Sequence, residues 1–251
     1  NLQATSDQSA DMWYTLNGAA GPVHNSTTSY NTTLTLSDGS YTIDVYAKDM
    51  GGNIGTAEAN ITVDTTAPAI TVSSPTAKTY PSTSVQLSVS TDEPSSIWFN
   101  YNGTNSTPVS GTGLTATMTG LSEGANTVYV YAKDSANNLN VTQLTFNVDT
   151  HGPSVVITKP VEAGRYNGTI WIMASANDTV AQMWYNIDGG ANSTPVANNS
   201  LSAIETGLSE GSHTLNVFSN DSVGNVGTAT VNFTVDKTAP TVSIVSPVSY
   251  T

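Results

Sequence analysis

The sequence predicts an all-β chain of three tandem β-sandwiches, the first of which lacks its own first strand, strand A. The main observation is a segment of the form Val-Asp-x-x-x-Pro, here called the linker mark, which occurs at residues 63–68, 148–153 and 235–240. Its aspartates lie 85 and then 87 residues apart, which is the size of one small sandwich domain. No segment shows the 3.6-residue periodicity of an amphipathic helix.

A strand that contains a tryptophan and ends in a tight turn recurs in each repeat. The three segments read DMWYTLNG, SIWFNYNG and QMWYNIDG, and Asn-Gly and Asp-Gly are preferred centres of two-residue type I′ hairpin turns. A later segment alternates apolar and polar residues in each repeat, as in NTVYVYAKD. This period of two indicates a strand with one buried face.

The second repeat contains the complete set of strands. It has seven short apolar segments, which read AITVSSP, SVQLSVST, SSIWFNYNG, TPVS, LTATMTGL, NTVYVYAKD and NVTQLTFNVD. Seven such segments with turn signals between them are typical of an immunoglobulin-like sandwich. The repeats therefore predict domains at 1–68, 69–153 and 154–240, followed by an orphan strand A at 241–251.

The first and last residues of the sequence complement each other. NLQATSD aligns with the second strand of the later repeats, whereas TVSIVSPVSYT aligns with their strand A. Two interpretations are open. Either the chain is a window of a longer array, or Val242, Ile244 and Val245 of one copy complete the first sandwich of the next, because an unpaired strand edge is a template for strand addition. The second interpretation predicts a head-to-tail polymer.

Composition excludes several classes of function. Six Lys and Arg stand against nineteen Asp and Glu, and a net charge of -13 repels nucleic acids and anionic membrane surfaces. Cysteine is absent, so disulfides and thiolate zinc sites are excluded, and no apolar run is long enough to span a membrane. His24, His151 and His213 fall at unrelated points of their repeats, and no catalytic motif accompanies them, so we expect no enzyme.

Acidic residues gather where each linker mark should meet the following sandwich. A loop expected before each tryptophan strand supplies aspartate or glutamate, and a turn after the later strand supplies an Asp-x-x-x-Asn pair. Carboxylates without nearby Lys or Arg repel one another unless a cation intervenes, and Ca²⁺ prefers oxygen ligands. We therefore expect calcium at the joints, bound by Asp64, Asp92, Asp134 and Asn138 and by Asp149, Asp178, Asp221 and Asn225. The alternative is that each aspartate only closes its own turn.

The tryptophans lie on the polar side of their strands. Met12, Ile97 and Met183 alternate with them and belong to an unbroken apolar row that should be buried. The opposite face should then present aromatic side chains, and exposed aromatic strips commonly contact protein or sugar. The expected interface residues of this strip are Trp13, Trp98, Trp184, Tyr129 and Tyr131. The alternative is that a loop or the sheet edge covers each tryptophan.

Twelve asparagines stand in the Asn-x-Ser/Thr pattern of N-glycosylation acceptors, which is more than the number expected by chance in a chain so rich in Ser and Thr. They predict an exported glycoprotein, whereas the alternative is that they are accidental. The twelve are Asn25, Asn31, Asn60, Asn102, Asn105, Asn140, Asn167, Asn177, Asn192, Asn198, Asn220 and Asn232.

The pattern VDxTAPxVxIxSP, the hairpin WYNIDGG and the segment HTLNVFSNDSVGNVGTATVNFTVD resemble the immunoglobulin-like repeats of bacterial and archaeal cell-surface proteins, and this resemblance covers essentially the whole chain. It implies an extracellular location. Such repeats build adhesins, S-layers, sheaths and surface filaments, and also act as spacers beside enzyme modules. The favoured interpretation is a structural subunit of a filament, sheath or S-layer. The alternatives are a glycan-binding adhesin and a passive spacer of a larger surface protein.

Overall fold

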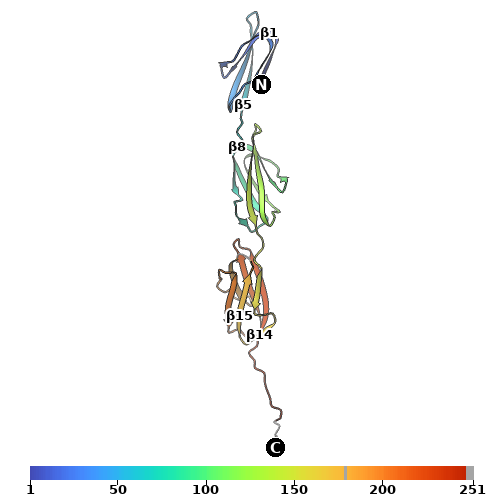
Figure 1. The fold of residues 1–251 in the computed structure, drawn as a ribbon, viewed down its shortest axis with the longest axis vertical. Helices are drawn as coiled ribbons and strands as arrows, with labels where there is room; N and C mark the ends of the chain where they lie inside the picture. Colours follow the sequence, from blue (N-terminus) through green and yellow to red (C-terminus); the bar gives the residue numbers. More distant parts are fainter. Residues whose placement is uncertain (178–179, 247–251) are drawn as a thin grey trace. The chain divides into compact units, whose positions relative to one another are not determined.

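The computed structural model describes residues 1–177 and 180–246, and these residues form strands and no helix (Figure 1). None of them could therefore provide a helix that crosses a membrane. The chain divides into two compact units, one with Asn1–Ser74, Leu87–Ala116 and Thr127–Leu144, the other with Pro75–Gln86, Thr117–Asn126 and Thr145–Thr251. Each linker mark belongs to the same unit as the residues to which it is hydrogen-bonded. The predicted domain boundaries stay a prediction.

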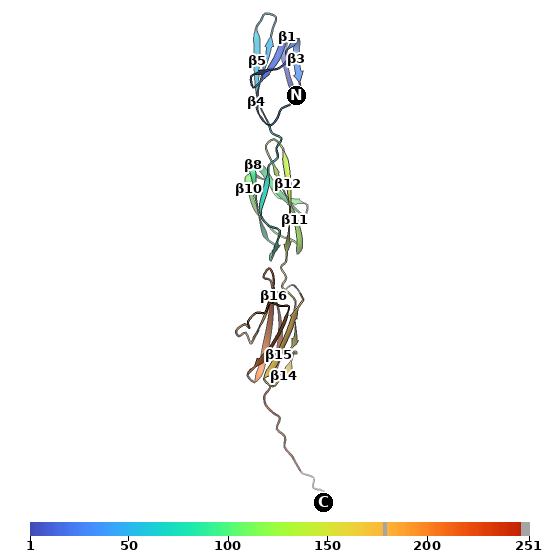
Figure 2. The same cartoon turned by 60° about the vertical axis from the view of Figure 1, so that its left-hand side comes forward.

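The first repeat forms a five-stranded sheet with the order β2-β1-β4-β5, in which β3 also pairs with β1 (Figure 2). Its strands are β1 (Leu2–Leu16), β2 (Ala19–Ala20), β3 (His24–Thr32), β4 (Gly39–Lys48) and β5 (Ile54–Val63). The first residues of β1 pair with β3, and its last residues pair with β4. Asn17 and Gly18 both have positive φ, as the predicted type I′ turn requires.

The second repeat forms a seven-stranded sheet, but these strands are not the seven predicted segments, because two pairs of predicted segments each form one continuous strand and two two-residue strands were not predicted. Its strands are β6 (Ile70–Ser74), β7 (Thr79–Tyr80), β8 (Val85–Tyr101), β9 (Thr104–Asn105), β10 (Val109–Met118), β11 (Gly124–Lys133) and β12 (Leu139–Val148). β8 pairs with β6 through its first half and with β11 through its second half.

One sequence expectation about β8 is wrong. The acidic residues before the tryptophan strand were expected in a loop, but Asp92 and Glu93 lie inside β8, and Asp7 likewise lies inside β1. In β8 the hydroxyls of Thr91 and Ser95 both donate to the carbonyl of Glu93, at 2.8 and 3.0 Å. These two bonds satisfy the Glu93 carbonyl beside Pro94, a residue that has no backbone N–H to donate.

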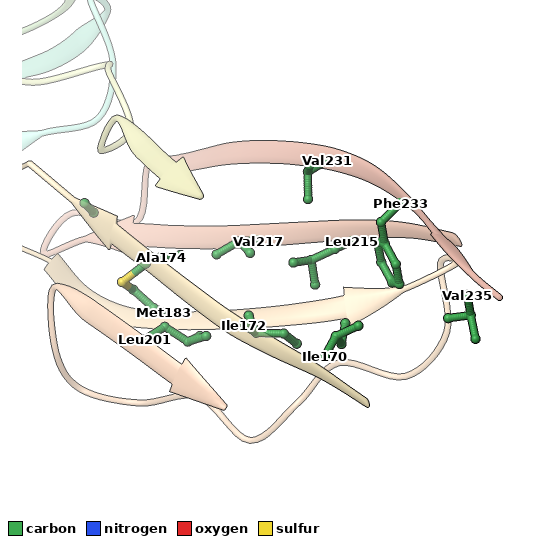
Figure 3. Close-up of a cluster of buried hydrophobic side chains, with 11 residues drawn as sticks. Ile170, Ile172, Ala174, Met183, Leu201, Leu215, Val217, Val231, Phe233 and Val235 are labelled. Atoms are coloured by element: carbon green, nitrogen blue, oxygen red, sulfur yellow. The ribbon is translucent and has the colours of Figure 1, made fainter. Parts of the chain in front are cut away.

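The third repeat forms two sheets, one with the order β13-β15-β17 and the other with the order β14-β19-β18-β16. Its strands are β13 (Val155–Lys159), β14 (Gly164–Tyr166), β15 (Thr169–Ala176), β16 (Val180–Ile187), β17 (Ser200–Thr206), β18 (Gly211–Asp221) and β19 (Val226–Val235). Ile172, Met183, Leu215 and Phe233 are buried between them (Figure 3). Burial of each such side chain stabilises the folded repeat by about 1.5–3 kcal/mol, so this core holds the two sheets together.

The first repeat has a much smaller core than the third. Its buried cluster consists of Ala10, Met12 and Tyr30, and Leu2 and Ala4 are only partly buried against it. Strand A accounts for the difference. In the third repeat β13 supplies Val155 and Ile157 to the core, whereas among the described residues no strand takes that place in the first repeat.

Candidate functional site

The first linker mark brings three carboxylates together. The side chains of Asp64, Glu93 and Asp134 each place an oxygen within 4.8 Å of the other two. Burial, together with the negative charges of Asp64, Asp134 and Asp92, raises the pKa of Glu93. Burial also acts to raise the pKa of Asp134, but hydrogen bonds from Asn138 and neighbouring amides outweigh it and hold that pKa below its usual value. This cluster is therefore strained by like charge, and its oxygen ligands suit a hard cation such as Ca²⁺.

Asp92 and Asn138, both expected as ligands, have other partners. The Oδ1 atom of Asp92 accepts a hydrogen bond of 2.7 Å from the amide of Ala69, where β6 is about to begin. Glu93, the next residue, takes its place in the cluster. The Nδ2 group of Asn138 donates to Asp134 at 2.8 Å and to the backbone carbonyl of Asp64 at 3.0 Å. Asn138 thus joins the linker mark to the second repeat as a donor.

The second linker mark repeats these hydrogen bonds, but the described residues there do not form a matching cluster of three carboxylates. The Nδ2 group of Asn225 donates to Asp221 at 2.8 Å and to the carbonyl of Asp149 at 2.7 Å. The Oδ1 atom of Asp221 already accepts from the amides of Val223, Gly224 and Asn225. This arrangement matches the alternative expectation, in which the aspartate closes its own turn. Asp178, the remaining expected ligand, lies outside the described residues.

A different group surrounds Asp149. Glu123, Asp149 and His151 place ligand atoms within 4.8 Å of one another, and His151 Nδ1 lies 3.1 Å from Glu123. Glu123 also accepts from the amide of Thr150 at 2.9 Å. An imidazole among carboxylates suits transition metals better than calcium. The sequence signal that could have found this group is the change from VDTTAP to VDTHGP.

Sequence reasoning also missed an acidic residue that anchors each linker mark to the repeat before it. In the turns LSDG, LSEG and LSEG, the acidic residues are Asp38, Glu123 and Glu210. Asp38 accepts from Thr65 and Thr66, Glu123 from Thr150, and Glu210 from Thr238 at 2.6 Å. The recurrence of these turns 85 and 87 residues apart was the available signal. Each mark is thus held by the repeat that it leaves.

The expected burial of the tryptophan strands is confirmed. Met12, Ile97 and Met183 are 1%, 0% and 0% exposed, whereas the tryptophans are half-buried on the other face. These three tryptophans each stack on the aromatic ring opposite them in the neighbouring strand: Trp13 on Tyr46 at 5.2 Å, Trp98 on Tyr131 at 5.2 Å and Trp184 on Phe218 at 5.6 Å. Tyr129 is 39% exposed. Use of these rings as an interface stays a prediction.

The predicted glycosylation sites differ in accessibility. Asn105 and Asn192 are exposed at corresponding places after the hairpin turns. In contrast, the Nδ2 group of Asn140, the atom that a glycan would modify, donates to the carbonyl of Pro68 at 2.8 Å. Asn220 is half-buried, and its Oδ1 atom is buried without a hydrogen-bond partner.

Comparison with known proteins identifies the class of the repeats. Residues 153–217 match the family described as bacterial Ig domain, and residues 24–91 match the family described as bacterial Ig-like domain (group 3). The chain is therefore made of tandem immunoglobulin-like repeats of the kind found in prokaryotic surface proteins, and the predicted resemblance and all-β fold are confirmed.

Two characterised proteins are similar in sequence. Halomucin of Haloquadratum walsbyi is 30% identical over 314 aligned positions, which include the whole of this chain but 3% of halomucin. Chitinase A1 of Niallia circulans is 28% identical over 190 positions, covering 71% of this chain and 27% of the chitinase, and it matches through its immunoglobulin-like part. The chain thus spans a minor part of both relatives.

Solved structures with a related fold include a 1.5-MDa bacterial ice-binding adhesin, with a TM-score of 0.44, 20% identity and coverage of 93% of this chain and 87% of that one. They also include the fibronectin(III)-like modules of Clostridium thermocellum CbhA, with a TM-score of 0.41, 19% identity and coverage of 66% and 94%.

Proposed function

We propose that the chain is an extracellular structural segment of a prokaryotic surface protein and acts as a subunit of a filament, sheath or surface layer. The observation that carries this proposal is the repeated joint. In each of the first two linker marks, an acidic residue of the preceding repeat accepts a hydrogen bond from the mark, and an asparagine of the following repeat donates one to it. In the second mark these residues are Glu123 and Asn225. Hydrogen bonds on both sides of a linker restrict its motion, which suits a mechanical role.

Immunoelectron microscopy tests this function. Antibodies raised against the purified chain should label a periodic structure on the outside of intact cells of the source organism. Label confined to the cytoplasm, or found only on secreted soluble protein, would contradict the structural role.

We also propose that Asp64, Glu93 and Asp134 bind calcium. Asp134 is buried, no Lys or Arg among the described residues forms an ion pair with the three carboxylates, and Asn138 fixes both Asp134 and the backbone of Asp64. A cation at this point would remove the mutual repulsion of the carboxylates and tie the linker mark to β8 and β11. Calcium titration of the chelator-treated protein, followed by elemental analysis, tests for binding.

A glycan-binding adhesin is the second candidate function. The stacked pairs of Trp13 with Tyr46 and of Trp98 with Tyr131 support it, because they place half-exposed aromatic rings on the polar face of the sheet, and exposed aromatic side chains commonly contact sugar. Glycan-array binding that is lost in Trp98→Ala would favour this function.

The similarity to part of a chitinase suits a third role, that of a passive spacer, which predicts a monomer without glycan affinity.

A further inference from the structure

Two of the predicted glycan acceptors are held in the same way, by an asparagine of the tryptophan strand. The Oδ1 atom of Asn105 accepts a hydrogen bond of 2.6 Å from the Nδ2 group of Asn100. In the third repeat the Oδ1 atom of Asn192 accepts from the Nδ2 group of Asn186 at 3.0 Å. Neither acceptor donates a hydrogen bond through its own Nδ2 group among the described residues. The atom that would carry a glycan is therefore free in both repeats.

The two asparagines that hold the acceptors are themselves oriented. The Oδ1 atom of Asn100 accepts from the amide of Gly103 at 3.2 Å, and the Oδ1 atom of Asn186 accepts from the Nδ2 group of Asn216 at 3.1 Å. Because an amide side chain has its oxygen and its nitrogen on opposite sides, each bond turns the N–H group of the holding asparagine toward the acceptor. The acceptor amides are thus fixed with their nitrogens directed away from the tryptophan strand's asparagine.

The backbone beside each acceptor is fixed as well. The amide of Ser106 donates to the Phe99 carbonyl at 2.8 Å, and the Oγ atom of Ser106 accepts from the Phe99 amide at 3.0 Å. Ser193 forms the same two bonds with Tyr185, at 2.8 and 3.1 Å. Since the acceptor's side-chain oxygen and the next residue are both hydrogen-bonded, a sugar attached to Asn105 would start from a defined place.

In the second repeat this place is a cavity of about 340 Å³. Its volume lies within the range of about 300–1,000 Å³ that is usual for small-molecule sites. The acceptor itself is part of the wall, and the other lining residues come from the tryptophan strand, from the segment after the hairpin turn and from β11. The cavity is lined by Ser96, Trp98, Asn105, Ser106, Pro108 and Lys133.

Trp98 provides the largest apolar surface of this cavity. Its indole is half-buried and is held by the parallel ring of Tyr131, with the ring centroids 5.2 Å apart. A pyranose ring carries C–H groups on its faces, so a sugar that covers an indole removes apolar surface of both partners from water. Lys133 forms no ion pair among the described residues, and its ammonium group is available to donate to sugar hydroxyls.

We propose that the innermost sugar of a glycan on Asn105 lies in this cavity, with its ring against Trp98 and its hydroxyls within reach of Lys133. The occupant is the chain's own glycan, because the acceptor is part of the cavity wall and its Nδ2 group is free. Attachment joins Nδ2 to C1 of the sugar while the bond from C1 to the phosphate of an activated sugar donor breaks, and one amide proton leaves with that phosphate.

The inference rests on the predicted glycosylation and goes beyond the proposed function, since the contact forms whether or not the chain builds a filament. It opposes the second candidate function at this ring, because a glycan of the chain itself would cover Trp98. Immunoelectron microscopy of the surface structure and the two experiments below therefore succeed or fail independently.

NMR spectroscopy of the glycoprotein from its native host tests the contact directly. The innermost sugar on Asn105 should show nuclear Overhauser effects to the indole protons of Trp98, and its C–H resonances over the ring should be shifted upfield. Both signals should vanish in Trp98→Leu, while mass spectrometry still finds the sugar on Asn105. The matched control is Trp184→Leu, the same change in the third repeat, which should leave these signals intact. A bare Asn105, or a sugar without contact to Trp98, overturns the proposal.

A stability cycle tests whether the contact contributes to the fold. Thr107→Ala destroys the acceptor pattern but keeps Asn105, whereas the control Thr107→Ser preserves the pattern. Loss of the sugar through Thr107→Ala should lower the melting temperature by about 2–8 °C, the change expected for a contact as strong as an aromatic pair. In a Trp98→Leu background the same loss should have no effect, because the sugar no longer has its partner. Equal shifts in the two backgrounds, or no shift in either, overturn the proposal.

Discussion

Asn225 donates its side-chain N–H to the backbone carbonyl of Asp149 at 2.7 Å, across 76 residues of sequence. Asn138 makes the same bond to Asp64 across 74 residues. Both asparagines are also fixed by an aspartate four residues earlier, so each linker carbonyl meets a donor that is already oriented. The first two linker marks are therefore part of the hydrogen-bonded structure of the repeat that follows them.

Removing this donor should destabilise the third repeat. We expect Asn225→Ala to lower the free energy of unfolding by about 1–3 kcal/mol, because the Asp149 carbonyl and the Asp221 carboxylate both lose a partner. Asn53→Ala is the matched control, since Asn53 makes the same bond to its own aspartate but none to a linker. Denaturant unfolding should show the smaller loss for Asn53→Ala. Equal losses would mean that the linker bond contributes nothing.

His213 should make the third repeat sensitive to pH. The backbone carbonyl of Ser209, at 2.9 Å, and the carboxylate of Asp188, at 2.7 Å, raise the pKa of His213 above its usual value, although burial and Lys237 oppose them. Both ring nitrogens face acceptors, so the protonated imidazolium satisfies both. A raised folded-state pKa gives stability that is fully present below pH 6.5 and is lost as pH rises through the folded pKa.

The measurement is denaturant unfolding from pH 5 to pH 9. The variant His213→Asn introduces the residue type that the second repeat has at this position, where Asn126 stands. It should flatten the dependence of the unfolding free energy on pH above neutrality. A wild-type stability that does not fall between pH 6.5 and pH 9 would show that His213 is neutral in the folded protein.

The fold was predictable from short-range patterns. Period-two alternation identified the strands, and Asn17-Gly18 identified a turn whose two residues do have positive φ. The expected loop at Asp92 was wrong because its evidence was local polarity, whereas the backbone there continues as β8, held by hydroxyl bonds to the Glu93 carbonyl. Polarity shows where water can reach a strand, but it does not end the strand.

The site was less predictable, because its contacts join residues far apart in the sequence. The aspartates of the linker marks stood out by repetition, but nothing in the sequence tells whether Asp92 or Glu93 faces Asp64, since adjacent residues of a strand point to opposite faces. The anchors Asp38 and Glu123 were missed for a related reason. They lie in turns where an acidic residue is ordinary, and only their bonds to the linker threonines distinguish them.

Substitution of Glu93 should affect stability in opposite directions with and without calcium. In chelator, Glu93→Gln should raise the melting temperature, because it removes a carboxylate whose pKa is raised by burial and by its acidic neighbours. With millimolar calcium the wild type should gain stability that Glu93→Gln does not. Asp92→Asn is the control and should leave the calcium response intact, since Asp92 bonds to the Ala69 amide instead. A wild-type melting curve that calcium does not move would remove the metal site.

Glycan occupancy should follow accessibility at the twelve predicted acceptors. Asn105 and Asn192 should carry sugar, because both are exposed and follow hairpin turns that leave room for a bulky group. Asn140 should be bare if the repeat folds before modification, since its Nδ2 group is bound to Pro68, and half-buried Asn220 should be bare for lack of access. Glycopeptide mass spectrometry of protein from its native host measures all four sites. Sugar on Asn140 and Asn220 at the same level as on Asn105 would mean that modification precedes folding, and bare Asn105 and Asn192 would contradict the expectation that accessible acceptors carry sugar.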